Sequence, residues 1–330
     1  MWKFLIQINK KLIIAIPIMM VCGFLFGVAV DEGIVKQLKS LIMPFTFLMV
    51  YPMMVTLNIK HLKEGIKNVK LQVTTQVINF AVVPFLAYGL GILFFKDQPY
   101  MALGLLLASL LPTSGMTISW TGFAKGNMGA AINMTVIGLT LGALATPFYV
   151  QALMGAKVDV NIYLIVKQIV LIVFMPMLLG YITRTSLLKK HGMPKFKKEI
   201  APRFPAMSTI GVLGIVFVAL ALKAKTIAGN PSILGSIIVP LLIIYFINFL
   251  LGTVLGKLFF KRGDAIALVY GTVMRNLSIA LAIAINAFGA EGANAALVIA
   301  ISYIIQVQSA AWYVKFTTKI FGPSSEEAAA

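Results

Sequence analysis

The sequence has few of the side chains that bind metals or form covalent cross-links. Its 330 residues include one cysteine, Cys22, and two histidines, His61 and His191, which both lie in lysine-rich stretches that we interpret as loops. A single cysteine excludes a disulfide framework and a thiolate-rich metal site within the chain. We therefore expect neither a histidine-based catalytic centre nor a metal centre.

Charged residues are also scarce. Asp, Glu, Lys and Arg make up 12% of the chain, 60% of the residues are hydrophobic, and the mean hydropathy is +0.95. Soluble domains carry roughly 25% charged and 45–50% apolar residues. A soluble fold of this length has too little interior to bury so much apolar surface, whereas a bilayer accommodates it. The composition therefore predicts a membrane protein.

Apolar runs long enough to form membrane-spanning helices recur along the whole chain. A spanning helix needs roughly 20 mostly apolar residues, and we count ten such runs. The first run has no small-residue cleavage site after it, which favours a spanning helix over a signal peptide. The prediction is an all-α polytopic membrane protein with ten transmembrane helices. They cover residues 12–30, 41–57, 72–95, 100–123, 128–154, 162–182, 205–222, 233–260, 265–288 and 293–316.

Lysines and arginines are distributed unevenly over the predicted loops. Twenty of the 28 fall at the two termini or in loops after even-numbered helices, and seven fall on the opposite side. The positive-inside rule then predicts a cell (inner) membrane protein with both termini in the cytoplasm. Because the basic residues are spread over membrane-proximal loops, the formal charge of +18 does not indicate a nucleic-acid partner. Residues 189–203 form the longest predicted polar linker and divide the chain near its middle.

Two similar heptapeptides close the third and eighth predicted helices. They are LGILFFK at residues 90–96 and LGKLFFK at residues 255–261. Five helices separate the copies, and because this number is odd the two copies have opposite orientations in the membrane. Inverted repeats are a transporter architecture with the substrate site near the bilayer midplane. We expect two inverted five-helix repeats, residues 1–155 and 156–330.

The fourth predicted helix contains a sequence that opens the helical backbone. Pro112 removes a backbone donor, and Thr113, Ser114, Gly115 and Thr117 follow it closely. In lipid, an opened backbone must bond to protein or water, and these hydroxyl groups offer partners. A proline kink packed by small residues is the alternative interpretation.

The ninth predicted helix holds a counterpart with Arg275 near the centre of an apolar run. A central arginine costs about 2.5–3.5 kcal/mol on translocon scales, so it is expected to face a cavity or polar partners. No Asp or Glu lies in any predicted span. Two interpretations stay open: the guanidinium binds an anionic ligand, or it holds the two breaks together through backbone carbonyls. The candidate site residues around it are Gly271, Thr272, Met274, Asn276 and Ser278.

Further polar side chains lie on the third, fifth, eighth and tenth helices, next to the two broken ones. Each is able to form an interhelical hydrogen bond worth roughly 1 kcal/mol. Their clustering predicts a polar central cavity, while the first, second, sixth and seventh helices hold few polar groups and are expected to form a separate domain. The polar residues are Asn79, Asn133, Thr135, Asn248, Gln306 and Gln308.

At these residues the sequence resembles the bile acid:sodium symporter family and its wider superfamily, which includes the arsenite permeases. The resemblance covers nearly the whole chain and is carried by LPTSG, AKGN, MRN and LAIA, which begin at residues 111, 124, 274 and 281. It implies a panel domain (12–57 and 162–222) and a core domain (72–154 and 233–316). In the core domain, the broken fourth and ninth helices cross.

The resemblance also implies sodium ligands, which this sequence keeps only in part. Asn79, Thr117 and Thr135 match family ligands in kind, while Gly271 replaces an acidic residue and Arg275 replaces a glutamine. Sodium needs oxygen ligands, and a fixed positive charge repels it. The hypothesis is that Arg275 stands where a sodium ion would lie. Thr117 and Thr135 would then be remnants of a degenerate sodium site, and no metal site is assigned.

The arsenite permeases provide a second comparison. Trp120 and Lys125 match them, but their fourth-helix cysteine falls on Thr113 and their acidic residue before LAIA falls on Ala280. Arsenite favours a thiolate ligand, and Cys22 lies on a different helix. Efflux of arsenite or antimonite is therefore an alternative function, although both residues that are diagnostic of the arsenite permeases are absent.

The predicted function is secondary active transport of a small, anionic organic solute by alternating access. The half-helix ends at the two breaks and the arginine would supply positive charge that is complementary to an anionic solute. A channel-like uniporter is a further alternative. No carboxylate pair, His/Cys constellation or Gly-rich phosphate loop lies in the spans, so we predict no enzyme. The expected partners are a small-molecule substrate and the bilayer, with sodium or a proton as coupling ion and the oligomeric state left open.

Overall fold

The computed structural model describes residues 6–8, 11–56 and 68–323, and this part of the chain is helical apart from short connections. Four short 3-10 or π segments join or extend the helices: η1 (Leu38–Leu41), η3 (Ile78–Val82), η4 (Val170–Phe174) and η5 (Phe196–Ile200). The α-helices are α2 (Leu12–Ala29), α3 (Glu32–Gln37), α4 (Ile42–Thr56), α6 (Val69–Val77), α7 (Val83–Phe94), α8 (Pro99–Leu110), α9 (Gly115–Phe123), α10 (Met128–Met154), α11 (Ile162–Ile169), α12 (Met175–Lys195), α13 (Arg203–Gly229), α14 (Ser232–Phe259), α15 (Arg262–Val273), α16 (Leu277–Phe288) and α17 (Gly292–Phe321).

Within the described residues, six continuous helical segments are long and apolar enough to cross a membrane, and four shorter helices are also apolar. Large apolar side chains such as Leu93, Phe148 and Phe246 are more than two-thirds exposed on the outside of the molecule. Water would disfavour such a surface, whereas acyl chains match it. The chain is therefore a polytopic membrane protein. The six segments are Val69–Phe94, Met128–Met154, Ile162–Ile200, Arg203–Gly229, Ser232–Phe259 and Gly292–Phe321.

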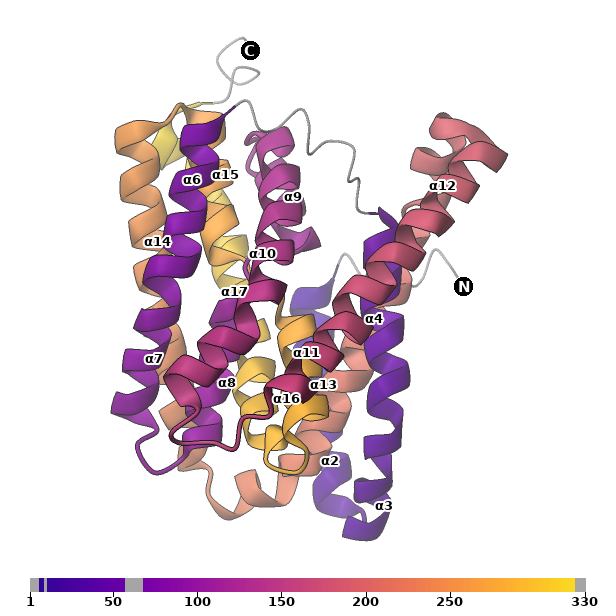
Figure 1. The fold of residues 1–330 in the computed structure, drawn as a ribbon, viewed down its shortest axis with the longest axis vertical. Helices are drawn as coiled ribbons and strands as arrows, with labels where there is room; N and C mark the ends of the chain where they lie inside the picture. Colours follow the sequence, from indigo (N-terminus) through magenta and orange to yellow (C-terminus); the bar gives the residue numbers. More distant parts are fainter. Residues whose placement is uncertain (1–5, 9–10, 57–67, 324–330) are drawn as a thin grey trace.

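The helices form two groups, which we call the α13 group and the α17 group (Figure 1). The α13 group consists of α2, α4, α12 and α13, and α13 contacts both α2 and α4. The α17 group consists of α6 to α10 and α14 to α17, with α17 against α8, α14 and α16. The two groups meet where α16 contacts α4 and where α13 contacts α17.

Glycine allows the backbones of the α13 group to approach closely. A Cβ atom on Gly23 would lie 2.4 Å from the carbonyl oxygen of Phe217, and one on Gly27 would lie 2.2 Å from that of Ala221. These two glycines form a G-x-x-x-G pattern, which is typical of tightly packed membrane helices. The group is therefore held together by direct backbone contact between α2 and α13.

The predicted polar linker at residues 189–203 is wrong, because most of it is helical. The α12 helix continues to Lys195 and, through η5, to Ile200, with a bend at Gly192 (φ 74°). Figure 1 shows this basic helical extension standing clear of the other helices. Lysine lowers hydropathy but is a good helix former, so the apolar run ends before the helix does. His191, predicted to lie in a loop, is part of α12.

Phe196 shows what stabilises this extension. Its side chain is buried, and the guanidinium of Arg184 lies 5.2 Å from the centre of its ring. Arg184 also donates a hydrogen bond to the carbonyl of Thr56 at the end of α4. The extension is therefore tied to α4.

The two heptapeptides end their helices in the same way. The α7 and α14 helices end at equivalent positions, and the amides of Phe95 and Phe260 bond to the carbonyls of Gly91 and Gly256. Each helix then turns back against the next one, α8 or α15. Other predicted features fall outside the described residues, namely Leu57 at the end of the second predicted helix, His61, Lys3, Lys10, Lys60, Lys63 and Lys67.

Candidate functional site

The two predicted helix breaks cross in the middle of the α17 group. One break separates α8 from α9, and the other separates α15 from α16. The breaks run antiparallel, with the amide of Thr113 2.7 Å from the carbonyl oxygen of Met274 and the amide of Asn276 2.8 Å from that of Leu111. The opened backbone of each break thus forms hydrogen bonds with the other. In lipid, backbone groups need such partners within the protein.

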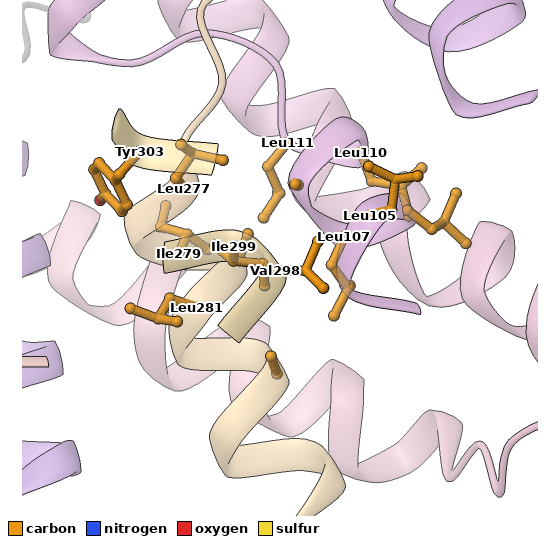
Figure 2. Packing of buried hydrophobic residues seen from close by; sticks show 14 of the residues in the cluster. Leu105, Leu107, Leu110, Leu111, Leu277, Ile279, Leu281, Val298, Ile299 and Tyr303 are labelled. Carbon is orange, nitrogen blue, oxygen red and sulfur yellow. The ribbon is translucent and has the colours of Figure 1, made fainter. Parts of the chain in front are cut away.

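Apolar side chains surround this crossing. Figure 2 shows Leu107 and Leu111 from the α8 side near Ile279 of α16 and Val298 of α17. All four side chains are fully buried. Apolar packing therefore covers this side of the crossing, where an unpaired polar group is costly.

Thr113 adopts a strained conformation at the crossing. Its φ angle is 66°, in the left-handed region that a β-branched residue seldom adopts. Its hydroxyl donates to the carbonyl of Pro112 at 2.5 Å, and further backbone carbonyls of α10 lie 3.2–3.3 Å away. Glycines at positions 138 and 142 allow the α10 helix to approach this closely. A Cβ on Gly138 would lie 2.8 Å from that hydroxyl, and one on Gly142 would lie 2.8 Å from the Pro112 ring.

We expect Gly138→Val to destabilise the protein by about 1–3 kcal/mol, the usual cost of overpacking. The new side chain would displace Thr113 and with it the backbone pairing of the two breaks. Thermal unfolding in detergent measures the effect. The matched control is Gly235→Val, because a Cβ on Gly235 meets no atom within 4 Å. Equal melting temperatures for the two variants would contradict the packing described above.

The helices that begin at the crossing are both capped by side chains. The Ser114 hydroxyl accepts from the amide of Met116, and the Thr117 hydroxyl accepts from the amide of Ser114, which forms a capping box for α9. The side-chain Oδ1 of Asn276 accepts from the amide of Ile279 and caps α16. Both helices thus begin in a defined geometry, with a partial positive charge at each start.

Arg275 is buried, with 3% of its surface exposed, and it holds the crossing at several points. Its Nη2 donates to the carbonyl of Thr272 in the last turn of α15, where a partial negative charge accumulates. Its own amide donates to Oε1 of Gln306 at 2.8 Å, and Nε2 of Gln306 donates back to its carbonyl at 3.2 Å. Its Nε and Nη1 have no hydrogen-bond partner within the described part of the chain.

Other predicted polar residues connect neighbouring helices to the crossing or bond within their own helix. Asn79 donates to the carbonyl of Gly271 at 3.0 Å, which ties η3 to α15. The hydroxyls of Thr135 and Thr272 donate to carbonyls one turn earlier in their own helices. Asn133 is buried, and its Oδ1 has no partner among the described residues.

A cavity of about 400 Å³, which we call the central cavity, lies between the α13 group and the α17 group. One wall is formed by the starts of α9 and α16 together with residues of α10 and α17. The opposite wall is formed by α4 and α13. The first wall includes Ser114, Gly115, Met116, Ser119, Asn276, Leu277, Ser278 and Tyr303, and the second includes Met53, Thr56, Ser208, Thr209 and Val212.

Five of the predicted site residues line the central cavity: Ser114, Arg275, Asn276, Ser278 and Gln306. The structure places the other nine elsewhere, either in the crossing itself or in the helices packed on it. These nine are Asn79, Pro112, Thr113, Thr117, Asn133, Thr135, Gly271, Thr272 and Met274.

Sequence reasoning missed Tyr303, whose hydroxyl bonds to that of Ser278. It also missed Ser119 and the whole second wall of the cavity. The adjacent hydroxyl residues Ser208 and Thr209 could have indicated this wall, because they interrupt an otherwise apolar helix. Ser208 donates to the carbonyl of Met49, which joins α13 to α4 beside the cavity.

Comparisons with known proteins show which family the sequence belongs to. The Sodium Bile acid symporter family model matches residues 43–230. An arsenical-resistance protein Acr3 from Alkaliphilus metalliredigens is 25% identical over 287 residues, which cover 83% of this chain and 80% of that protein. The uncharacterised transporter slr0944 from Synechocystis is 26% identical over 283 residues (79% and 73%). The uncharacterised sodium-dependent transporter YocS from Bacillus subtilis is 25% identical over 272 residues (80% and 78%).

The family model covers more than half of the chain, and the relatives cover most of it. The predicted resemblance is therefore confirmed, as is the prediction that the protein is not an enzyme. The chain belongs to the sodium bile acid symporter family and is a secondary transporter of the superfamily that also includes the Acr3 proteins.

Proposed function

We propose that the protein carries a small organic anion across the membrane by alternating access at the central cavity. The observation that carries this proposal is that α9 and α16 both begin at the wall of this cavity. A helix start carries roughly half a positive charge and free amide groups, which together favour an anion. No Asp or Glu is among the described residues that line the cavity.

The other lining residues indicate the rest of the substrate. The hydroxyls of Ser119, Ser278 and Thr56 offer hydrogen bonds, while Met53 and Val212 offer apolar contact. A volume of about 400 Å³ lies within the range of small-molecule sites, roughly 300–1,000 Å³. This combination suits a carboxylate attached to a compact apolar body.

The proposal includes ten membrane crossings in two inverted repeats, residues 1–155 and 156–330, with both termini in the cytoplasm. The matching ends of α7 and α14 support the repeats. Beyond the six long segments, α2 and α4 would each cross once, and the broken pairs α8–α9 and α15–α16 would each cross once. The α13 group would be the panel domain and the α17 group the core domain. Rocking of one against the other would open the central cavity to each side in turn.

We further propose that transport is not coupled to sodium at the crossing. The Arg275 guanidinium donates to a carbonyl of α15, where its charge takes the place of a cation. Thr117 accepts from the amide of Ser114, so one lone pair that a sodium ion would need is already used, and the Thr135 hydroxyl donates within α10. A sodium ion beside a fixed positive charge would be repelled.

A two-step experiment tests the transport proposal. A thermal-shift screen of the purified protein against pyruvate, succinate, cholate, taurocholate and arsenite identifies the ligand with the largest stabilisation, which we call the probe anion. Counterflow of the labelled probe anion is then measured in proteoliposomes. We expect saturable counterflow that unlabelled probe anion inhibits. Non-saturable flux with single-channel conductance would contradict the carrier mechanism and favour a channel.

The sodium proposal has its own test in the same proteoliposomes. We expect that an inward sodium gradient alone does not drive uptake of the probe anion, because Arg275 replaces the ion. Uptake is compared in sodium and potassium buffers for the wild type and for Arg275→Gln. If a sodium gradient drives uptake in both proteins with the same dependence on sodium, the proposal is wrong.

Arsenite efflux is a second candidate because two of the relatives are arsenical-resistance proteins. The Thr113 position, where those permeases are expected to carry cysteine, points its hydroxyl at backbone carbonyls and does not line the central cavity. Cys22 lies exposed on α2. We therefore expect no protection of an arsenite-sensitive host that expresses this protein. Growth at otherwise toxic arsenite concentrations would reverse this preference.

A further inference from the structure

A second, much smaller cavity lies on another side of Arg275. Its volume is about 10 Å³, and residues of α8, α14 and α17 line it together with the arginine. A cavity of about this size holds one water-sized particle. We call it the rear cavity, and its polar lining residues are Ser109, Tyr245, Asn248, Arg275 and Ser302.

The polar groups at the rear cavity are buried and incompletely paired. Arg275 is 97% buried, and its Nε and Nη1 lack partners within the described residues. Asn248 is equally buried, and its Oδ1 also lacks a partner there. The Tyr245 hydroxyl donates to Oε1 of Gln306 at 3.1 Å, so it accepts in its 2.9 Å contact with the Ser302 hydroxyl. Hydrogen-bonding capacity at this cavity therefore exceeds what the described protein groups use.

Charge distinguishes the possible occupants. Among the described residues that line the rear cavity there is no carboxylate, so the guanidinium has no ionic partner there. An uncompensated buried charge costs several kcal/mol, and a water molecule satisfies hydrogen bonds without neutralising that charge. A small anion does both.

We propose that the rear cavity binds a single small anion, with chloride, an ion slightly larger than a water molecule, as the natural occupant. Arg275 would donate from Nε and Nη1, and the Ser302 hydroxyl would turn its proton from Tyr245 to the anion. The Asn248 amide would exchange the positions of its oxygen and nitrogen, so that its NH₂ group points inward. The cavity is too small for a carboxylate, a phosphate or a sulfate, so this site is separate from the central cavity.

The bound anion would connect four elements. It would join the break between α15 and α16, through Arg275, to α8, α14 and α17, which all contribute to the rear cavity. Anything that binds the folded state stabilises it. The protein should therefore be more stable in halide salts than in salts of larger anions, whatever solute it transports.

The test is thermal unfolding of the purified protein in detergent, first dialysed into sodium gluconate. Chloride or bromide is then titrated at constant ionic strength and constant sodium concentration, with sulfate as a parallel series. We expect a saturable rise of a few degrees in melting temperature with chloride and bromide and none with sulfate. Identical curves in all salts would overturn the proposal and leave water as the occupant.

A cavity-filling variant locates the effect. Ser109→Val places a methyl group in the rear cavity, and the hydrogen bond that it removes lies within α8, from Ser109 to the carbonyl of Leu105. We expect it to unfold cooperatively but to lose the halide response. Ser309→Val is the matched control, because Ser309 also bonds within its own helix and does not line the cavity.

The combined outcomes separate this inference from the proposed function. A halide response that persists in Ser109→Val would contradict the location, whereas its loss in that variant alone would support it. Neither measurement involves transport, so a negative result leaves the central cavity untouched. Crystals soaked in bromide would supply a direct check. We expect an anomalous peak beside Arg275, and its absence would contradict anion binding in the rear cavity.

Discussion

Replacement of Arg275 by methionine is expected to lower counterflow of the probe anion roughly 10- to 100-fold. The variant loses the charged hydrogen bond to the carbonyl of Thr272 and leaves the last turn of α15 without its counter-charge. A hydrogen bond to a charged group contributes about 1.5–3 kcal/mol, and 1.36 kcal/mol corresponds to a factor of ten in rate. Counterflow at saturating probe anion measures the change.

Arg275→Lys is the matched control for this prediction. Lysine keeps the positive charge near α15 but lacks the planar fork of the guanidinium. We expect an intermediate rate, with more activity than in Arg275→Met. If the methionine variant transports at the wild-type rate, the arginine neither positions the crossing nor takes part in transport.

Replacement of Gln306 by leucine is expected to have a similarly large effect, mainly on stability. The Gln306 amide pairs with both the N–H and the C=O of Arg275, inside the break where helical partners are missing. Leucine would leave two buried backbone groups unpaired, at about 1–3 kcal/mol each. We expect a lower melting temperature and loss of counterflow.

Gln308→Leu provides the comparison for this change. Gln308 lies two residues further along α17, is only half-buried, and does not line the central cavity. We expect its melting temperature to stay close to that of the wild type. Equal destabilisation by the two leucine substitutions would show that the pairing between Gln306 and the backbone of Arg275 does not contribute to stability.

The helix breaks could be predicted from sequence because their signals are local. Pro112 removes a backbone donor, and Arg275 stands alone in an apolar run, so each indicates an opened or polar site by itself. That the two broken helices cross was implied by the family resemblance, but their backbone pairing through Thr113 and Met274 was not predicted. Neither local pattern specifies such a partner.

The second wall of the central cavity, and Tyr303 on the first wall, were missed for a different reason. Ser208 and Tyr303 lie on helices that are apolar on most of their surface, and periodicity does not show which face meets another helix group. Their place at the cavity arises from the packing of α13 and α17. The role of Thr117 was likewise hidden, because a hydroxyl that caps a helix and one that binds a ligand have the same sequence signal.

The helical extension of α12 is a third case. Its lysines mark the end of the apolar run, and hydropathy alone therefore places a linker at residues 189–203. Helix propensity and the contact between Arg184 and Phe196 extend the helix beyond this point. Hydropathy thus locates the edge of the membrane more directly than the end of a helix.

The central claim is that the α13 group and the α17 group move relative to each other around the central cavity. A disulfide between Met53→Cys on α4 and Gly115→Cys on α9, in a Cys22→Ser background, tests it most directly. A Cβ on Gly115 would lie 3.9 Å from Cγ of Met53, close to disulfide range. We predict that oxidation stops counterflow of the probe anion and that reduction restores it. Full counterflow in the cross-linked protein would contradict this account.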